Sequence, residues 1–273
     1  MGMENNATNP KNRKEVPQRL WLANEANLTF AVKKVKVTGK ENIQEIPPGA
    51  KIVIITTHLT DLDIPVAIHA VARDLDVSVT NLSTHHKFFG KQGEMPTNIG
   101  IRIAGKDNFI PIDYHKDEEG KKSPKAFNPE NFEPAVEAME NGKSIIVAAH
   151  NPSKEPLQNL DSVRGGYGGV YLAELTDAYI LPLTVTLDKA VGMYNDTLKT
   201  VKERPSASAV IGKPFKLEKI EGIEHFSELT KKRKSGEGLN EEERKEFSRL
   251  ADALRKRSQE VIERLYAQLL TQN

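Results

Sequence analysis

The segment Lys51–Thr57 (KIVIITT) places the tightest constraint on what this chain can fold into. Its β-branched residues favour a strand. Because apolar and polar residues do not alternate in it, the pattern indicates a strand that is buried on both faces. Such strands occur mainly in sheets covered by helices on both sides. Ser144–Ala149 (SIIVAA) and Tyr179–Thr186 (YILPLTVT) have the same character.

Helix-like segments alternate with these strands along the chain. Helices are expected at Ile64–Leu75, Asn131–Asn141 and Gly168–Asp177. Further strands are expected at Val77–Leu82, Phe109–Ile112 and Ala209–Phe215, and at Leu28–Gly39, where Lys and Val alternate from Lys34 to Val37. This alternation predicts an α/β fold with a mixed, largely parallel sheet flanked by helices.

The last third of the chain predicts a charged linker followed by a long helix. Lys231–Lys234 and Gly236–Gly238 suggest the linker, and Asn240 with Glu243 forms a capping-box pattern at the start of a helix over residues 240–271. An apolar stripe follows at helical spacing: Phe247, Leu250, Leu254, Val261, Leu265 and Leu269. The helix is expected to pack on its own domain, with a membrane-surface or partner helix as the alternative. Residues 1–27 are expected to form a disordered or helical leader, and residues 28–273 one α/β domain.

Composition limits the classes of function. The 39 Lys and Arg balance 38 Asp and Glu, so the overall charge gives no reason to expect nucleic acid as a partner. The absence of cysteine excludes disulfides, cysteine nucleophiles and cysteine-ligated zinc. No apolar run reaches the roughly 18 residues of a membrane span, and the polar start lacks a secretory signal. We therefore expect a cytoplasmic protein.

The best candidates for chemistry follow the buried strand, in the segment His58-Leu59-Thr60-Asp61-Leu62-Asp63. The carboxyl ends of parallel strands are where α/β folds place their sites. On a continuous helix His58 and Asp63 would point roughly 140° apart, so they can meet only across a turn. His58 could then donate its Nδ1 proton to Asp63 and use Nε2 as a base. Alternatively, Asp61 or Asp63 caps the helix and His58 is structural.

Four motifs in order along the chain resemble the glycerolipid acyltransferase superfamily of glycerol-3-phosphate and lysophosphatidic acid acyltransferases. The His58-x4-Asp63 spacing after a hydrophobic strand is similar to the family signature. Val35–Asn42 resembles its strand and Gly-x-Glu-Asn lead-in, Ile180–Leu183 its Pro-containing strand, and Ile211–Pro214 its Gly-x-Pro element. The resemblance covers about Val35 to Phe215 and is followed by the family's terminal helix.

The resemblance implies an O-acyltransferase. In this family, the His takes the proton of an acceptor hydroxyl, which attacks the thioester of acyl-CoA or acyl-carrier protein, and the Asp orients the imidazole. For this chain it implies His58 as general base, Asp63 as its orienting residue, and a glycerolipid or related hydroxyl acceptor. No metal or other cofactor is implied. An acyl-enzyme is not needed, which suits a chain without cysteine or a Gly-x-Ser-x-Gly elbow.

Two motifs depart from the family pattern. Tyr114 stands where an Arg that grips the acceptor's phosphate is expected, and Tyr cannot form the bidentate charged pair of Arg. After Ser144–Ala149, the sequence His150-Asn151-Pro152-Ser153-Lys154-Glu155 replaces Phe-Pro-Glu-Gly-Thr-Arg-Ser. Three interpretations remain open: a different acceptor, an anion site rebuilt by Arg102, Lys106, Lys154 and Arg164, or a non-catalytic lipid- or acyl-carrier-binding relative. The candidate substrate-binding residues are Tyr114, His150, Ser153, Lys154 and Arg164.

Two further features concern ligands. The Gly-rich segment Arg164–Gly169 precedes a helix, where it could hold an anion or let the helix pack closely. The basic clusters Lys231–Lys234 and Arg255–Arg257 suggest weak peripheral contact with the inner face of an anionic membrane, and a solvated charged face is the alternative.

Overall fold

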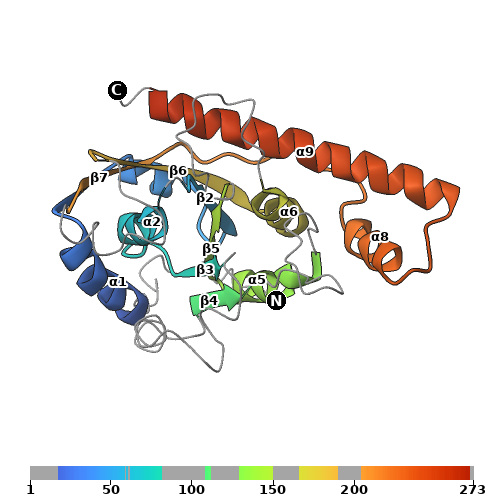
Figure 1. Cartoon of the computed structure of the whole chain (residues 1–273), viewed down its shortest axis with the longest axis horizontal. Helices are drawn as coiled ribbons and strands as arrows, with labels where there is room; N and C mark the ends of the chain where they lie inside the picture. Colours follow the sequence, from blue (N-terminus) through green and yellow to red (C-terminus); the bar gives the residue numbers. More distant parts are fainter. Residues whose placement is uncertain are drawn as a thin grey trace, which may run out of the picture.

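A seven-stranded sheet forms the centre of the molecule, in the order β1-β7-β6-β2-β5-β3-β4 (Figure 1). The computed structural model describes residues 18–58, 60, 62–81, 108–111, 129–149, 166–189 and 204–270. The strands are β1 (Lys34–Thr38), β2 (Ile52–Thr56), β3 (Val77–Asn81), β4 (Phe109–Pro111), β5 (Ser144–Ala148), β6 (Tyr179–Leu187) and β7 (Ser206–Ile211). Neighbours are parallel except β6 and β7. The expected mixed, largely parallel sheet is confirmed.

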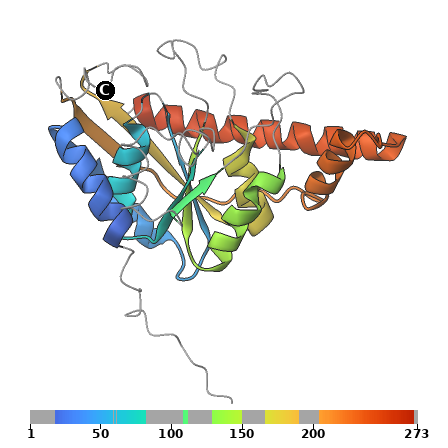
Figure 2. The same ribbon diagram turned by 60° about the horizontal axis from the view of Figure 1, so that its bottom comes forward.

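Helices cover both faces of the sheet (Figures 1 and 2). One core cluster contains residues of α1 (Gln18–Ala31) and α2 (Asp63–Val71). The other contains residues of α5 (Glu133–Glu140), α6 (Tyr167–Thr176), α8 (His225–Lys234) and α9 (Glu241–Leu270). Two short 3-10 helices, η1 (Lys40–Glu45) and η3 (Pro129–Phe132), complete the described elements. The three expected helices correspond to α2, to η3 with α5, and to α6.

Strand β2 is buried on both faces, as its sequence predicts. Ile52 and Ile54 lie in the cluster with α1 and α2. Val53 and Ile55 lie in the cluster with α5, α6 and α9. Because successive side chains of a strand point to opposite faces, an uninterrupted apolar run is needed where both faces are covered. This places the end of β2 in the interior of the molecule.

The first predicted strand is shorter than expected. Leu28 belongs to α1, and the strand begins only at Lys34. The helix prevails because Leu20 and Leu28, each 4% exposed, pack into the core. The packed part of the chain therefore begins ahead of residue 28, the boundary expected from the sequence.

Strand β7 also differs from its prediction. It begins at Ser206 rather than Ala209, and it lies inside the sheet between β1 and β6. Phe215, expected at its end, instead forms an isolated bridge with Ile180. The sheet edge on this side is formed by β1, whose exposed Lys34 and Lys36 suit an unpaired edge.

The segment Lys231–Lys234, expected in a linker, is the last turn of α8. Two physical causes favour the helix. Phe226 and Leu229 are buried on its inner side, and cations in a last turn interact well with the helix dipole. The linker expected here is thus wrong for these four residues.

Helix α9 confirms both features predicted for it. The backbone N–H of Asn240 donates to Glu243 Oε2 at 2.8 Å, and the N–H of Glu243 donates to Asn240 Oδ1 at 2.9 Å, which is the predicted capping box. Leu250, Leu254 and Leu265 are each 0% exposed. The helix packs across α6 and β6, as Figure 1 shows. It is therefore a packing helix of its own domain.

Candidate active site

The end of β2 is fixed between its two neighbouring strands. The Thr57 N–H donates to the Leu183 carbonyl of β6 at 3.2 Å, and the Ala149 N–H after β5 donates to the Thr56 carbonyl at 2.8 Å. Thr57 itself is fully buried, and its Oγ1 accepts the Val185 N–H at 3.0 Å. The hydrogen-bonded ladder therefore continues to the residue before His58. Sequence reasoning did not single out Thr57, although its place at the end of a buried strand was a signal.

His58 leaves the sheet at this point and is half-buried. It follows a strand in the middle of the sheet, and the residue before it, Thr57, is held by hydrogen bonds to β6. A side chain at the carboxyl end of such a strand has a defined position without depending on a long loop. The location predicted for His58 from the sequence agrees with the structure.

Asp63 is the first residue of α2 and is 1% exposed. Its Oδ2 accepts the backbone N–H of Thr60 at 3.0 Å, and its Oδ1 accepts the Thr60 hydroxyl at 2.7 Å. The Thr60 Oγ1 in turn accepts the Leu62 N–H at 3.2 Å. These bonds close the turn that leads into α2, whose N-cap is Leu62, so Asp63 does not itself cap the helix. They also hold a fully buried carboxylate near the carboxyl end of β2, the strand that His58 follows.

The last turns of α9 reach the carboxyl ends of β2 and β5, where Ile262 lines a cavity with Ala149, and they carry Tyr266, which sequence reasoning missed. Tyr266 is 8% exposed and lies beside Ile262 and Leu269. Burial and, second, the negative charge of Asp63 raise the pKa of Tyr266 to about 12. The available signal was its spacing, four residues after Ile262, but the predicted apolar stripe did not include either residue.

The last turn of α9 is anchored on the sheet. Gln268 Nε2 donates to the Val210 carbonyl at 2.5 Å and to Thr184 Oγ1 at 3.3 Å. A Cβ on Gly212 would lie 2.4 Å from Gln268 Oε1, so any larger residue at this position would require the Gln268 side chain to shift. The anchor on Thr184 lies next to Val185, the residue that binds Thr57.

The segments that resemble family motifs contact one another. Asn42 Nδ2 donates to the Ile211 carbonyl at 2.8 Å, 169 residues away in the chain. Gly39 has a φ of 78°, and a Cβ there would lie 2.0 Å from the same carbonyl oxygen. The Gly212 N–H donates to the Pro182 carbonyl at 2.8 Å. The lead-in, the Pro-containing strand and the closing element thus form one connected unit beside β2.

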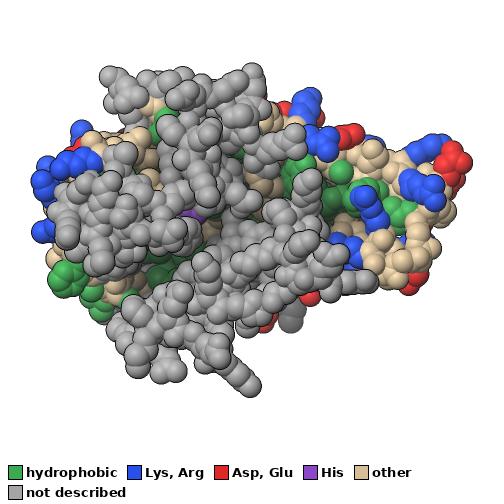
Figure 3. Space-filling model, viewed as in Figure 1, with side chains coloured by type: hydrophobic (Ala, Val, Ile, Leu, Met, Phe, Trp, Pro, Cys, Tyr) green, Lys and Arg blue, Asp and Glu red, His purple; other side chains and the backbone are tan. Residues whose placement is uncertain are grey.

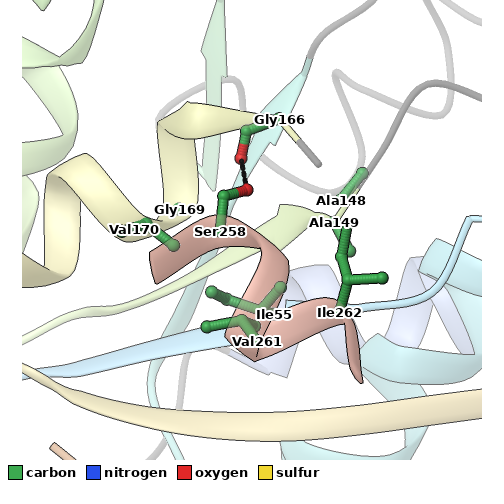
Figure 4. A pocket seen from close by; sticks show the side chains of 9 residues that line it. All are labelled: Ile55, Ala148, Ala149, Gly166, Gly169, Val170, Ser258, Val261 and Ile262. Atoms are coloured by element: carbon green, nitrogen blue, oxygen red, sulfur yellow. Dashed lines mark hydrogen bonds between the residues drawn. The ribbon is translucent and has the colours of Figure 1, made fainter. Parts of the chain in front are cut away.

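A small cavity lies between α6, α9 and the ends of β2 and β5 (Figure 4). Ile55, Ala149 and Ile262 supply much of its apolar lining. Ser258 of α9 donates a 3.3 Å hydrogen bond to the carbonyl of Gly166, at the start of α6. The cavity volume is about 10 Å³, room for about one water molecule.

The glycines of α6 serve close packing. A Cβ on Gly168 would lie 2.4 Å from Phe132 Cζ, and one on Gly169 would lie 3.0 Å from Ile55 Cδ1. Both side chains belong to the core beneath the helix. For these two glycines, the packing alternative is the one that the structure supports.

Most of the other candidate residues lie outside the described residues. These are the candidate substrate-binding residues Tyr114, His150, Ser153, Lys154 and Arg164, together with the possible anion-site residues Arg102 and Lys106. The structure therefore places His58 and Asp63 and leaves the acceptor side as a prediction.

Four residues of the basic clusters, Lys231, Lys232, Arg255 and Arg257, are paired with acids. Figure 3 shows Lys and Arg beside Asp and Glu at the end of the molecule formed by α8 and the start of α9. The pairs are Lys231–Glu130, Lys232–Glu243, Arg255–Asp252, Arg257–Glu218 and Arg257–Glu260. Such pairing reduces the positive charge that these clusters offer to an anionic surface.

No group of three or more His, Cys, Asp or Glu in the described part of the chain could hold a metal ion. Among the described helices, none is both long enough and apolar enough to span a membrane.

No model of a protein family matches the sequence, and no curated protein is similar to it at a significant level. Among solved structures, the chain is similar to the 1-acyl-sn-glycerophosphate (LPA) acyltransferase PlsC from Thermotoga maritima, with 16% sequence identity and a TM-score of 0.49. The match covers 79% of this chain and 75% of that chain. At this level of similarity, the match adds no argument about the activity of this chain.

Proposed function

We propose that this protein is an O-acyltransferase that uses His58 as general base and Asp63 as its orienting carboxylate. One observation carries the proposal. A His at the end of a buried central strand is followed, across a single turn, by a fully buried Asp at the start of the next helix. Burying a carboxylate costs free energy that hydrogen bonds or a nearby positive charge must offset. The end of a central strand is where α/β folds place catalytic groups.

The connected motif segments support the proposal independently of the His–Asp spacing. The lead-in around Asn42 contacts Ile211, and the closing element contacts Pro182 of β6. Strand β6 pairs directly with β2, with Pro182 opposite Ile55. Segments that resemble one family in order along the chain are therefore neighbours in space, as parts of one site would be.

The reaction follows from the roles of the two residues. His58 accepts the proton of the acceptor hydroxyl as its oxygen attacks the thioester carbonyl. The C–S bond then breaks, an oxygen ester remains on the acceptor, and the imidazolium returns its proton to the thiolate of CoA or the carrier protein. Asp63 stabilises the imidazolium between these steps. Hydrogen bonds donated by Thr60 to both carboxylate oxygens favour the charged form that this role requires.

We propose acyl-CoA or acyl-carrier protein as donor and a glycerolipid or related hydroxyl compound as acceptor. The donor follows from the family resemblance. The acceptor is defined less narrowly, because Tyr114 occupies the place of a phosphate-gripping Arg. Two explanations of this substitution predict opposite results when several acceptors are compared. If the natural acceptor has no phosphate, acceptors without a phosphate should be preferred. If a phosphate site is rebuilt from Arg102, Lys106, Lys154 and Arg164, acceptors with a phosphate should be preferred.

A thiol-release assay tests the activity. Palmitoyl-CoA is supplied with glycerol, glycerol 3-phosphate, lysophosphatidic acid or lysophosphatidylcholine, and free CoA is measured with a thiol reagent. Because the chain has no cysteine, the reagent reports only CoA. Palmitoyl-acyl-carrier protein, with ester formation followed by mass, tests the second donor.

The variants are His58→Ala and a matched control, His225→Ala, which removes an exposed imidazole at the start of α8. We expect acyl transfer with at least one acceptor, a loss of about 10³-fold in His58→Ala, and normal activity in His225→Ala. Transfer by the wild type that is no faster than in His58→Ala, with both donors, would contradict the proposal.

The departures in the second and third motifs favour one alternative, a non-catalytic relative that binds lipid or an acyl carrier. In that case, both the wild type and His58→Ala should bind palmitoyl-CoA or palmitoyl-acyl-carrier protein with equal affinity and transfer nothing. Isothermal titration of the two proteins separates this outcome from catalysis.

We further propose a cytoplasmic location with weak peripheral contact at the inner membrane face. Each Lys or Arg near an anionic surface contributes about 1 kcal/mol, and the acids paired with these clusters reduce that contribution. Co-sedimentation with vesicles of phosphatidylglycerol and phosphatidylcholine should be detectable at low salt and lost at high salt. No co-sedimentation at low salt argues against membrane contact.

A further inference from the structure

Two large apolar side chains are exposed among the described residues, and both belong to α1. Phe30 is 70% exposed and Leu22 is 52% exposed. Leu28 and Ala31 of the same helix are buried in the core. Since successive helix positions are rotated by about 100°, the Phe30 ring points away from that core. An exposed ring of this size gains free energy when another apolar surface or phase covers it.

The end of α1 that carries Phe30 is tied to the residues before β7. Arg204 Nη2 donates to two carbonyls at the end of α1, at 2.7 and 3.2 Å. The Lys33 N–H donates to the Pro205 carbonyl at 3.0 Å. The Phe30 ring therefore projects from a helix end that hydrogen bonds fix on the sheet.

Four exposed basic residues lie at the strand ends beside Phe30. Lys34 pairs with Ser206 in the register of β1 and β7, and the Asp188 N–H donates to the Ser206 carbonyl at 3.0 Å. The ends of β1, β6 and β7 thus lie together. The basic residues there are Lys33, Lys34, Lys189 and Arg204. Together with Phe30 they form one surface, the α1 end.

Positive charge exceeds negative charge at the α1 end. Asp188 is the acid of this group, and its Oδ1 accepts the Ser206 N–H at 2.8 Å. This hydrogen bond lowers the pKa of Asp188, and the charges of Lys189 and Lys33 act in the same direction. In the described part of the chain, none of the four cations forms an ion pair within 4 Å, unlike the paired cations of α8 and α9.

The α1 end lies beyond His58 at the same edge of the sheet. Strand β6 runs parallel to β2, with Leu183 opposite Thr56, and continues to Leu187. It therefore ends two positions, or about 7 Å, beyond the level of His58. Figure 3 shows hydrophobic side chains together with Lys and Arg at the end of the molecule where α1 and β7 lie.

We propose that the α1 end is the surface with which this protein contacts an anionic membrane. An aromatic ring beside unpaired cations suits a lipid surface, because the ring enters the boundary between head groups and acyl chains while the cations stay at the phosphates. The inference rests on the proposed function, since a lipid acceptor would then be met at the sheet edge that carries His58. It places the contact away from the basic clusters of α8 and α9.

Co-sedimentation of the full chain with vesicles of phosphatidylglycerol and phosphatidylcholine at low salt tests the apolar part. Phe30→Ala should lower the vesicle partition coefficient about tenfold. Leu22→Ala is the matched control. It removes the other exposed apolar side chain of α1, about 12 Å earlier along the helix, and should change the coefficient less than about twofold.

A second pair of variants tests the charges. Replacing Lys33 and Lys189 by Ala should lower the partition coefficient about fivefold for each cation removed, and binding should depend less on salt. Lys256→Ala removes an exposed cation from the cluster Arg255–Arg257 and should leave the coefficient close to the wild-type value.

Three outcomes overturn the inference. One is a wild type that does not co-sediment at low salt, and another is an equal loss in the test variants and their controls. The third is a wild-type dimer in sedimentation velocity that Phe30→Ala dissociates, because a second copy of the chain then covers the ring. Vesicle binding is measured without an acyl donor, so it decides the role of the α1 end separately. A wild type that binds vesicles but transfers no acyl group overturns the proposed function alone.

Discussion

Thr60 donates hydrogen bonds to both carboxylate oxygens of Asp63, from its backbone N–H at 3.0 Å and from its hydroxyl at 2.7 Å. The Asp63 N–H also donates to the Thr60 carbonyl at 3.3 Å, so these two residues close the turn that leads into α2. Closing this turn and orienting His58 are therefore compatible roles for Asp63. The turn that starts the helix also fixes the carboxylate at the end of β2.

The first prediction concerns this turn. Thr60→Val keeps the shape of the side chain and removes the hydroxyl that Asp63 Oδ1 accepts and that binds the Leu62 N–H. We expect unfolding to require about 1–3 kcal/mol less free energy, because a buried charged oxygen loses a partner. Acyl transfer should fall as well. Urea denaturation measures the first effect and thiol release the second.

Thr29→Val is the matched control for this substitution. The Thr29 hydroxyl donates to the Glu25 carbonyl on the exposed side of α1, so its loss should cost less than about 0.5 kcal/mol. Equal effects of the two substitutions would show that the bond to Asp63 has no special importance.

Glu174 in α6 should make stability depend on pH. It is 7% exposed, Oε2 accepts the Ile220 N–H at 2.9 Å, and Oε1 has no hydrogen-bond partner among the described residues. Burial raises the pKa of Glu174 above 4.5, against the lowering effects of the Ile220 N–H and Arg257. The native state therefore binds the proton more tightly than the unfolded state. This contribution to stability is fully present below the unfolded pKa and is lost as pH rises through the folded one.

Glu174→Gln should consequently be more stable than the wild type at pH 7, because the amide still accepts the Ile220 N–H without carrying a charge. The difference between the two proteins should shrink towards pH 4. Thermal melts from pH 4 to pH 8 measure it, and Glu45→Gln, at an exposed position, is the control. A difference that does not change with pH contradicts the assignment.

The sequence predicted the elements that are determined by residues close together in the chain. Ile52–Ile55 is apolar throughout because both faces of β2 are covered, so the burial of this strand and the position of His58 after it followed directly from the pattern. The capping box of α9 was predictable for the same reason, since residues only three apart form it.

Errors arose where a distant contact outweighed the local preference. The segment after Leu28 contains residues that favour strands, yet burial of Leu28 against the sheet keeps it in α1. The four cations of Lys231–Lys234 suggested a linker, yet Phe226 in the same helix packs on Phe247. In both cases, the deciding apolar surface comes from another element, which local patterns do not contain.

The candidate site shows the same division. His58 and Asp63 were predictable, because they share one turn after one strand. Tyr266 was not, because the effect of the Asp63 charge on its pKa depends on how α9 crosses the sheet, and a spacing of 203 positions has no signature in one sequence. The side-chain partner of Asp63 was also missed, although Thr60 precedes it by three residues, the spacing of a capping box.

The capping box of α9 supplies the third prediction. Asn240→Ala removes the oxygen that accepts the Glu243 N–H, and we expect a loss of about 1 kcal/mol in the free energy of unfolding. Asn240→Ser keeps a capping oxygen and should remain close to the wild type. Guanidinium denaturation compares the three proteins. Equal stability of the Ala and Ser variants would falsify the role given to this cap.

The fourth prediction concerns the contact between Gly212 and Gln268. A Cβ at residue 212 would lie 2.4 Å from Gln268 Oε1 and 2.8 Å from Cγ of the Pro182 ring, so we expect Gly212→Ala to shift the Gln268 amide and weaken its two hydrogen bonds. We expect about 1–3 kcal/mol of destabilisation and faster amide hydrogen exchange over residues 261–270. Gly166→Ala is the control, since a Cβ there meets the Ala149 carbonyl oxygen at an ordinary 3.6 Å. Gln268→Ala should reproduce the faster exchange and add little to Gly212→Ala, because both substitutions release the same turn of α9; exchange that stays at the wild-type rate in both contradicts this anchor.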